Sequence, residues 1–171
     1  SSNELLEFSN EQEDTIIKPL NQMGGRSIFR VKAGDSNANV IFETMTNYNN
    51  DFCIIQKFIP EISEGDKRIL LINGKPFPYA LARFPKENEN RGNLAAGGRA
   101  EVVALTKRDI EICDIVKNKL LDLGLIFVGL DVIGPFLTEI NVTSPTCVRE
   151  LERVTSRNIS SIIIDAMLEK L

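Results

Sequence analysis

The stretch Arg68-Ile-Leu-Leu-Ile-Asn-Gly-Lys-Pro-Phe-Pro-Tyr-Ala-Leu-Ala82 carries the strongest fold signal in the chain. Asn73-Gly74 favours a two-residue turn, because both residues tolerate the positive φ angles that such turns require. The runs on either side, 68–72 and 77–82, are rich in the apolar and aromatic side chains that strands favour. The sequence therefore predicts an antiparallel hairpin at its centre.

Strands and helices are predicted on both sides of this hairpin. Strands are expected at 15–20 and 27–31, joined as a hairpin, at 52–59, as a buried strand, and at 126–133 and 136–142, around Gly134-Pro135. Helices are expected at 39–48, from Thr106 to Gly124, and over 159–170. The fold class is therefore α+β, with a largely antiparallel sheet packed against helices.

Composition narrows the function classes. The chain has 171 residues, 43% of them hydrophobic, and a formal net charge of −4. The acidic balance argues against nucleic acid or a membrane as the main partner, and no apolar run is long enough to span a bilayer. The absence of histidine excludes Ser-His-Asp and Cys-His catalysis within this chain. Three cysteines without metal-ligand spacing fit free thiols in a reducing cytoplasm.

The hairpin around Pro135 places oxygen ligands together. If the turn is centred there, Asp131 faces Glu139, and Asn141 lies on the same side of its strand. Two carboxylates and an amide suit Mg²⁺, which prefers oxygen ligands. A solvated polar face is the alternative interpretation.

Other residues suggest a phosphate site. Lys18 precedes Gly24, Gly25 and Ser27, a loop whose backbone could approach a phosphate, although a Gly-Gly turn alone can be purely structural. Arg68 and Arg83 lie in otherwise apolar strands, where a charge requires a partner, so we favour a functional role for both.

Two further segments could contact substrate. Arg91 lies in the polar, glycine-containing stretch 85–98, for which a mobile loop is expected. Ser144-Pro-Thr-Cys-Val148 directly follows the Glu139 strand, so its hydroxyls could bind a carboxylate substrate. A helix-capping turn is the alternative for this segment. Cys147 is expected to be a packed thiol, because the chain offers no histidine to activate it.

Taken together, four segments closely resemble bacterial glutathione synthetase, a family of ATP-grasp ligases. They are Ile17-Lys-Pro-Leu-Asn-Gln-Met-Gly-Gly-Arg-Ser-Ile-Phe-Arg30, Gly65-Asp-Lys-Arg68, Arg91-Gly-Asn-Leu-Ala-Ala-Gly-Gly98, and Phe127-Val-Gly-Leu-Asp131 with Glu139-Ile-Asn-Val-Thr-Ser-Pro-Thr146. The resemblance runs in order from about Thr15 to the C-terminus.

The resemblance implies roles for the matched residues. In that family ATP lies between two α+β subdomains, which here would be 1–59, part of the central subdomain, and 60–171. The nucleotide would contact Lys18, the loop Met23, Gly24, Gly25, Arg26 and Ser27, the strand Gln56, Lys57, Phe58 and Ile59, and Asp66. Magnesium, or manganese in its place, would be held by Asp131, Glu139 and Asn141. Catalytic roles would fall to Arg68, Arg83 and Arg91, and substrate binding to Asn93, Ser144, Pro145 and Thr146.

The implied reaction transfers the γ-phosphoryl group of ATP to the cysteinyl carboxylate of γ-glutamylcysteine. The amine of glycine then attacks the acyl phosphate, and glutathione, ADP and phosphate leave. The 85–98 loop would close as a lid that excludes water. The alternatives are another ATP-dependent carboxylate-amine ligase and a non-catalytic nucleotide-binding module.

Family members are longer than this chain and begin with an N-terminal substrate-binding domain that is absent here. We therefore expect a fragment that folds but is inactive alone. The full-length protein is expected to be a cytoplasmic homo-oligomer.

Overall fold

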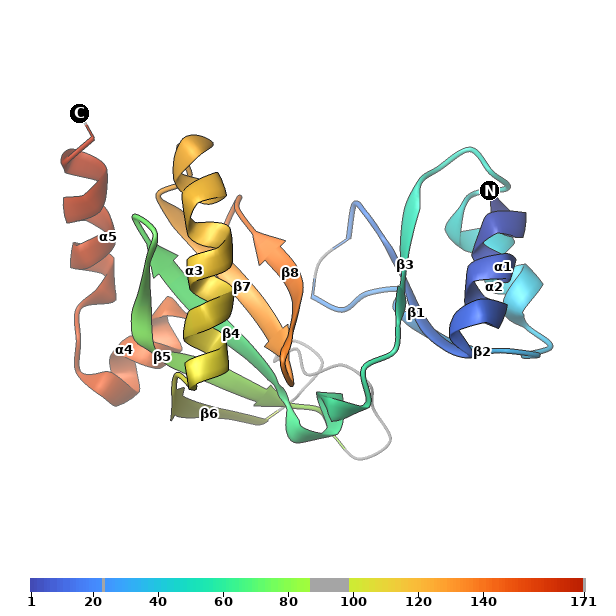
Figure 1. Cartoon of the computed structure of the whole chain (residues 1–171), viewed down its shortest axis with the longest axis horizontal. Helices are drawn as coiled ribbons and strands as arrows, with labels where there is room; N and C mark the ends of the chain where they lie inside the picture. The colour runs from blue at the N-terminus through green and yellow to red at the C-terminus, as the bar shows by residue number, and fades with distance from the viewer. Residues whose placement is uncertain (23, 87–98, 171) are drawn as a thin grey trace. The chain divides into compact units, whose positions relative to one another are not determined.

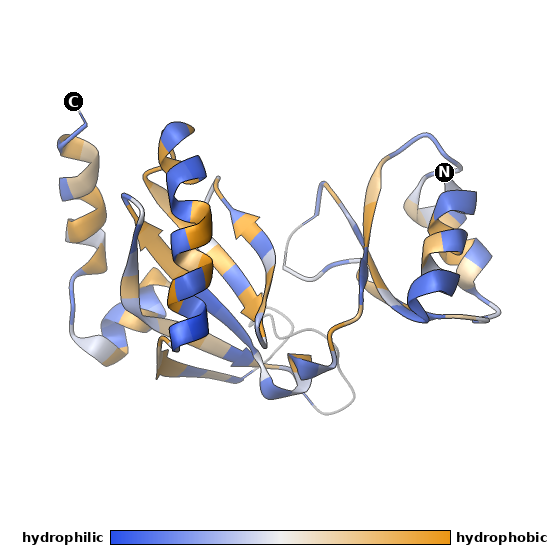
Figure 2. Cartoon of the chain, in the orientation of Figure 1, coloured by the Kyte–Doolittle hydropathy of each residue, from blue (hydrophilic) through white to orange (hydrophobic). Residues whose placement is uncertain are grey.

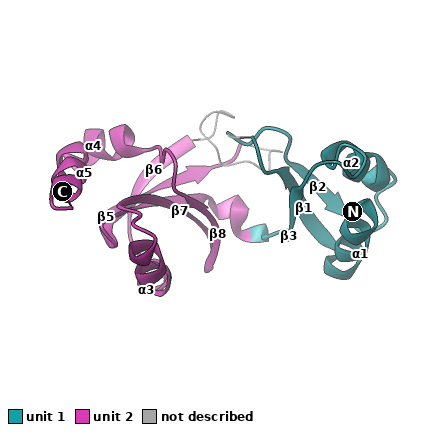
Figure 3. Cartoon of the chain, turned by 90° about the horizontal axis from the view of Figure 1, so that it is seen from above, with its two compact units in different colours: residues 1–60 teal, residues 61–171 magenta. Residues whose placement is uncertain are grey.

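The computed structural model describes residues 1–22, 24–86 and 99–170. Within them the chain divides into two compact units, Ser1–Pro60 (unit 1) and Glu61–Leu171 (unit 2), which Figure 3 shows in different colours. Met23, Arg91, Asn93 and most of the expected 85–98 lid lie outside the described residues. The predictions made for them stay predictions.

Unit 1 is a three-stranded antiparallel sheet, in the order β2-β1-β3, with two helices. Its elements are α1 (Ser2–Gln12), β1 (Asp14–Pro19), β2 (Phe29–Lys32), α2 (Ala38–Met45) and β3 (Cys53–Lys57). Both helices contribute to one core, in which Ile17, Val31 and Phe42 are completely buried. The predicted β1–β2 hairpin and the predicted short helix are confirmed.

Two features of unit 1 differ from what was expected from the sequence. β3 was expected to be buried, but within this unit it is an edge strand, with Ile54 38% exposed and the preceding Phe52 88% exposed. An apolar run reveals a strand but not its place in the sheet. Helix α1 was not predicted, although Ser1 and Glu4 form the capping box that begins it.

Unit 2 is built on a five-stranded antiparallel sheet in the order β6-β5-β4-β7-β8 (Figure 1). Its strands are β4 (Asp66–Ile72), β5 (Lys75–Phe84), β6 (Arg99–Ala104), β7 (Phe127–Ile133) and β8 (Phe136–Asn141). Its helices are α3 (Lys107–Asp122), α4 (Val148–Thr155) and α5 (Ile159–Leu168), and a 3₁₀ helix at Pro60–Glu64 precedes β4. No helix in the described parts of the chain is long and apolar enough to cross a membrane.

Both hairpins predicted for unit 2 are confirmed. β4 and β5 meet at Asn73-Gly74, where both residues have the positive φ angles that the sequence suggested, 47° and 72°. β7 and β8 are joined at Gly134-Pro135. Strand β6 and helix α4 were not predicted.

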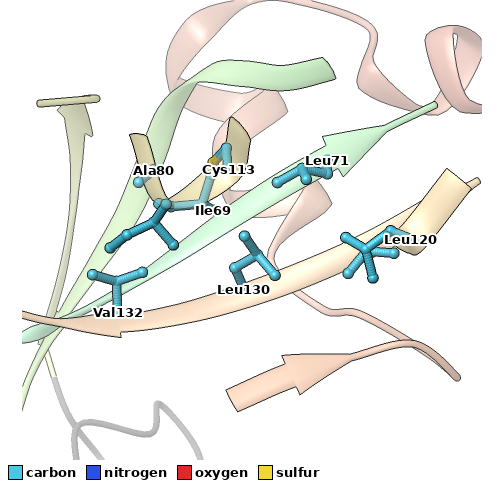
Figure 4. Close-up of a cluster of buried hydrophobic side chains, with 9 residues drawn as sticks. Ile69, Leu71, Ala80, Cys113, Leu120, Leu130 and Val132 are labelled. Atoms are coloured by element: carbon cyan, nitrogen blue, oxygen red, sulfur yellow. The ribbon is translucent and has the colours of Figure 1, made fainter. Parts of the chain in front are cut away.

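The sheet of unit 2 has a helical layer on each face. Ile69 and Leu71 of β4 pack toward α3, in the cluster drawn in Figure 4, with Leu130 among their neighbours. Leu70 and Ile72 of the same strand pack toward α4 and α5. Figure 2 shows the stripes of apolar and polar residues along α3 that this packing requires. Successive residues of β4 therefore belong to different cores.

Helix α3 is fixed to the sheet by a buried ion pair. Thr106 and Asp109 form its capping box, as the sequence predicted. Asp109 is completely buried, and its two carboxylate oxygens accept hydrogen bonds from Lys67 Nζ of β4 at 2.5 and 2.6 Å. One carboxylate thus caps the helix and pairs with the neighbouring strand.

Candidate functional site

The sheet face that packs against α4 and α5 becomes charged toward one end. Along β4 this face runs from Ile72 and Leu70, which are in the core, to Arg68 and Asp66. The strand register places Arg68 opposite Asp131 of β7, and Asp66 opposite Arg83 of β5. We call these four residues, Asp66, Arg68, Arg83 and Asp131, the arginine cluster. All four are buried.

The arginine cluster is a continuous network of charge-assisted hydrogen bonds. Arg68 donates from Nε and Nη2 to the two oxygens of Asp131, at 2.5 and 2.9 Å. Arg83 donates in the same forked manner to Asp66, at 2.7 and 2.6 Å, and its Nη2 lies 3.1 Å from Asp131 Oδ1. Two carboxylates balance two guanidinium groups, so the cluster has no net charge. The sequence-based expectation that both arginines would need buried partners is confirmed.

Burial and pairing shift the pKa values of the cluster. Burial opposes the charged form of Asp131, but the hydrogen bonds from Arg68 and the charge of Arg83 hold its pKa below the usual range. Burial raises the pKa of Asp66, and its hydrogen bonds with Arg83 offset only part of that effect. The pKa of Arg83 is raised, because Asp131 and Asp66 outweigh the effect of burial. Arg83 therefore keeps its charge.

A β-bulge presents Glu139 beside the cluster. The predicted pairing of Asp131 with Glu139 is confirmed, but the register shifts by one residue between Asp131 and Val132. Leu137 packs toward α3, and a regular strand would place Glu139, two residues later, on that same face. The extra residue, Thr138, lets Glu139 pair with Asp131 instead. The sequence did not reveal this bulge.

The donors of the expected magnesium site are brought together only in part. Glu139 is exposed beside Asp131, and Asn141 Nδ2 lies 3.5 Å from Asp131 Oδ2. Carboxylate and amide oxygens fit Mg²⁺ chemically. Both oxygens of Asp131, however, already accept hydrogen bonds from Arg68. Among the described residues there is no group of three or more acidic, cysteine or histidine side chains able to hold a metal ion.

The segment after β8 contacts the cluster through one hydroxyl. Thr146 Oγ1 accepts a hydrogen bond from Arg68 Nη1 at 3.2 Å, while Ser144 is exposed. The Cβ of Pro145 lies 3.0 Å from the position that a Cβ on Gly129 would occupy. Cys147 is a buried thiol in the apolar core, as expected, and burial raises its pKa.

The other nucleotide-site candidates lie in unit 1. Lys18 pairs with Ile54, and Ile16 with Gln56, so Lys18 and Gln56 lie on one face of the sheet, opposite the face of the buried Ile17.

The loop before β2 and the strand end after β3 complete that set. Gly24, Gly25 and Ser27 have positive φ angles of 69°, 77° and 53°, which is consistent with a tight loop before β2. Arg26 and Lys57 are exposed, and Ile59 is half-buried.

Sequence reasoning missed the interactions of Arg30. Its guanidinium carbon lies 3.6 Å from the centre of the Phe58 ring, and it donates in forked fashion to Asp14 at 2.9 and 2.6 Å. The signal in the sequence was Arg30 itself, a cationic side chain near the end of the strand predicted at 27–31. Phe58, expected at the adenine, is thus also the stacking partner of this arginine.

Comparison with protein families and curated proteins gives a consistent result. The model for the prokaryotic glutathione synthetase ATP-grasp domain matches residues 1–156. Glutathione synthetase from Vibrio cholerae is 54% identical over 164 residues, which are 96% of this chain and 52% of that protein. The synthetase from Yersinia pestis is 52% identical over 100% of this chain and 54% of its own length. The chain thus spans about half the length of these relatives.

Solved structures support the fold alone. The D-cycloserine synthetase DcsG aligns with a TM-score of 0.71 over 99% of this chain and 59% of that chain, at 12% identity. A D-alanine–D-alanine ligase from Bacillus anthracis aligns with a TM-score of 0.64 over 95% of this chain and 57% of its own, at 14% identity. The ATP-grasp fold expected from the sequence is thereby confirmed.

Proposed function

The chain belongs to the prokaryotic glutathione synthetase ATP-grasp family, and from this premise we propose that it forms the ATP-binding part of a glutathione synthetase. The proposed reaction is the ATP-dependent ligation of glycine to γ-glutamylcysteine through an acyl phosphate. The observation that carries the proposal is the buried arginine cluster, which holds two guanidinium groups in fixed orientations beside the β7–β8 hairpin that carries Glu139. The 54% sequence identity to the Vibrio cholerae glutathione synthetase supports it.

The residues of unit 2 suit phosphoryl transfer. Such transfer depends on positioned cations more than on a general base, which agrees with a chain without histidine. Arg68 and Arg83 are held in fixed orientations in a buried setting, and although Asp131 and Asp66 balance their charge, a guanidinium N–H directed at a phosphate oxygen there would bind it more strongly than in water. We assign them to the γ-phosphate and the acyl substrate, with Ser144, Pro145 and Thr146 at the peptide substrate.

The magnesium site is part of the proposal. Glu139, Asn141 and Asp131 would hold the ion, and Asp131 would have to exchange a guanidinium contact for it. A magnesium ion bound there would neutralise phosphate charge during the transfer. Manganese has the same preference for oxygen ligands.

Unit 1 would hold the nucleotide. Lys18 and Gly24 to Ser27 would contact its phosphates, with Met23 in the same loop, and Gln56 to Ile59 would line the adenine site. Asn93 would bind substrate and Arg91 would have a catalytic role, both as part of a lid at 85–98. The free cysteines support a reducing cytoplasm as the working compartment. Homo-oligomerisation of the full-length protein also remains a prediction.

The test is ADP release by the complete gene product with magnesium-ATP. Release that requires both γ-glutamylcysteine and glycine supports the proposal. Release that requires a different acid and amine would retain an ATP-dependent ligase and refute the proposed substrates. Nucleotide binding without ADP release for any pair would favour a non-catalytic module.

A further inference from the structure

A set of contacts at the end of β3 joins all three strands of unit 1. Phe58 directly follows β3, and its backbone N–H donates to the carbonyl oxygen of Asp14 of β1 at 2.8 Å. The carboxylate of Asp14 accepts two hydrogen bonds from Arg30 of β2, at 2.9 and 2.6 Å. The guanidinium carbon of Arg30 lies 3.6 Å from the centre of the Phe58 ring. These contacts close on themselves, and we call the three residues, Asp14, Arg30 and Phe58, the Phe58 clamp.

Arg30 reaches across a neighbouring strand to make these contacts. The strand order is β2-β1-β3, so β1 lies between Arg30 and Phe58. The register partner of Arg30 is Ile16, and Asp14, two residues earlier on β1, lies on the same face of the sheet. A planar guanidinium group can pair with a carboxylate through its edge and stack on a ring through its face, which an ammonium group cannot do. The clamp therefore depends on arginine, and lysine would not reproduce it.

The clamp lies on the sheet face that carries the nucleotide candidates of unit 1. The alternation of side chains along β1 places Asp14 on the same face as Ile16 and Lys18, opposite the face of the completely buried Ile17. Gln56 is the partner of Ile16 on β3 and lies on that face too. The clamp thus holds the end of β3 on the face to which nucleotide binding has been assigned.

The clamp is too exposed to be a main source of stability. The side chains of Arg30 and Asp14 are 30% and 29% exposed. The hydrogen bonds from Arg30 lower the pKa of Asp14, so the pair is charged at neutral pH. A partly exposed ion pair of this kind adds little to the free energy of unfolding. Its loss should leave the fold intact and release the Phe58 ring.

From this geometry we propose that Arg30 is a positioning residue that acts through Phe58 and holds the strand end 56–59 in the conformation that binds the base of the nucleotide. The proposal rests on the proposed function, which places the adenine site at these residues. It predicts that loss of Arg30 weakens nucleotide binding through the base and leaves the reaction at saturating ATP unchanged.

The experiment is a double-mutant cycle in the complete gene product. Arg30→Met keeps the length of the side chain and removes its charge and its forked pairing, whereas Arg30→Lys keeps the charge alone. Phe58→Leu removes the ring, and a double variant combines Arg30→Met with Phe58→Leu. The matched control, Lys32→Met, removes an exposed cation of the same strand, opposite Asp14. The measured quantities are the dissociation constant for ADP, the KM for ATP, kcat, the inhibition constant of inorganic pyrophosphate and the stability in urea.

Arg30→Met is expected to raise the dissociation constant for ADP and the KM for ATP about 10-fold, with kcat unchanged. Arg30→Lys should recover little of this loss, because it cannot pair and stack at once. The double variant should bind ADP no more weakly than the single variants, since both changes remove the same interaction. Pyrophosphate, which has no base, should inhibit Arg30→Met and the wild type equally. Lys32→Met should match the wild type in every quantity.

Unchanged ADP affinity in Arg30→Met would overturn the proposal. Additive losses in the double variant, or an equal loss of pyrophosphate binding, would also overturn it, because Arg30 would then act independently of Phe58. If Arg30→Met does not fold, Arg30→Lys supplies the same comparison. Failure of the proposed function looks different: the wild type itself would release no ADP with γ-glutamylcysteine and glycine, while the ADP affinities of the cycle would still test the clamp.

Discussion

Gly129→Ala is expected to disturb the arginine cluster through a single methyl group. The Cβ would lie 3.0 Å from Pro145 Cβ and 3.1 Å from Arg68 Cδ. Because both contacts are shorter than an ordinary carbon–carbon contact, each neighbour must retreat by a few tenths of an ångström. Arg68 is buried and donates hydrogen bonds to Asp131 and Thr146, and Pro145 has a rigid ring, so neither side chain moves freely.

Overpacking of this kind costs about 1–3 kcal/mol of unfolding free energy. A displaced Arg68 should in addition lower kcat by about 10- to 100-fold, because small misplacements of a catalytic group are expensive. Urea unfolding and steady-state ADP release in the complete gene product measure the two effects. The matched control is Gly124→Ala.

At Gly124 the φ angle is 70° and a Cβ would meet nothing within 4 Å. The control should therefore lose about 1–2 kcal/mol through backbone strain alone, with kcat unchanged. The reasoning would be refuted if Gly129→Ala kept wild-type kcat and stability, or if both variants lowered kcat equally.

Three further predictions concern the core, the pH dependence and the metal. Leu130 is completely buried, so Leu130→Ala should lower the unfolding free energy by about 3–5 kcal/mol in urea titrations; a loss below about 1 kcal/mol would contradict the packing described. Burial opposes ionisation of Asp109, but hydrogen bonds from Lys67 and Thr106 prevail and lower its pKa. Its contribution to stability is therefore present above the unfolded-state pKa of about 3.9 and lost as the pH falls below it. Asp109→Asn should therefore weaken the loss of stability at low pH, as measured by urea titrations between about pH 2 and pH 6. An unchanged loss of stability at low pH would contradict this role of Asp109. Glu139→Ala should abolish magnesium-dependent ADP release with stability within about 0.5 kcal/mol of the wild type, because the side chain is exposed; retained turnover would remove Glu139 from the metal site.

Local signals in the sequence predicted the elements that depend on neighbouring residues. Asn73-Gly74 specified one hairpin, the Thr106 capping box specified α3, and Gly134-Pro135 specified the β7–β8 hairpin, although the pairing of Asp131 with Glu139 within it also depends on the bulge. Each of these features is decided within a few residues of chain, where turn and cap chemistry acts directly.

Features that depend on distant partners were not predicted. The need of Arg68 and Arg83 for partners could be read from their apolar surroundings. Their pairing with Asp131 and Asp66 depends on the order and register of β5, β4 and β7, which no local pattern specifies. The edge position of β3 is likewise a property of the whole sheet.

The alternation of side chains along β4 divides its residues between two tasks. Lys67, Ile69 and Leu71 face α3 and hold that helix to the sheet, whereas Asp66 and Arg68 belong to the charged end of the other face. A directed-evolution library confined to the first set would search for variants of higher thermal stability while the arginine cluster, with its proposed catalytic role, stayed constant. Substitutions at the second set would instead break buried ion pairs and alter the contacts proposed for the γ-phosphate and the acyl substrate.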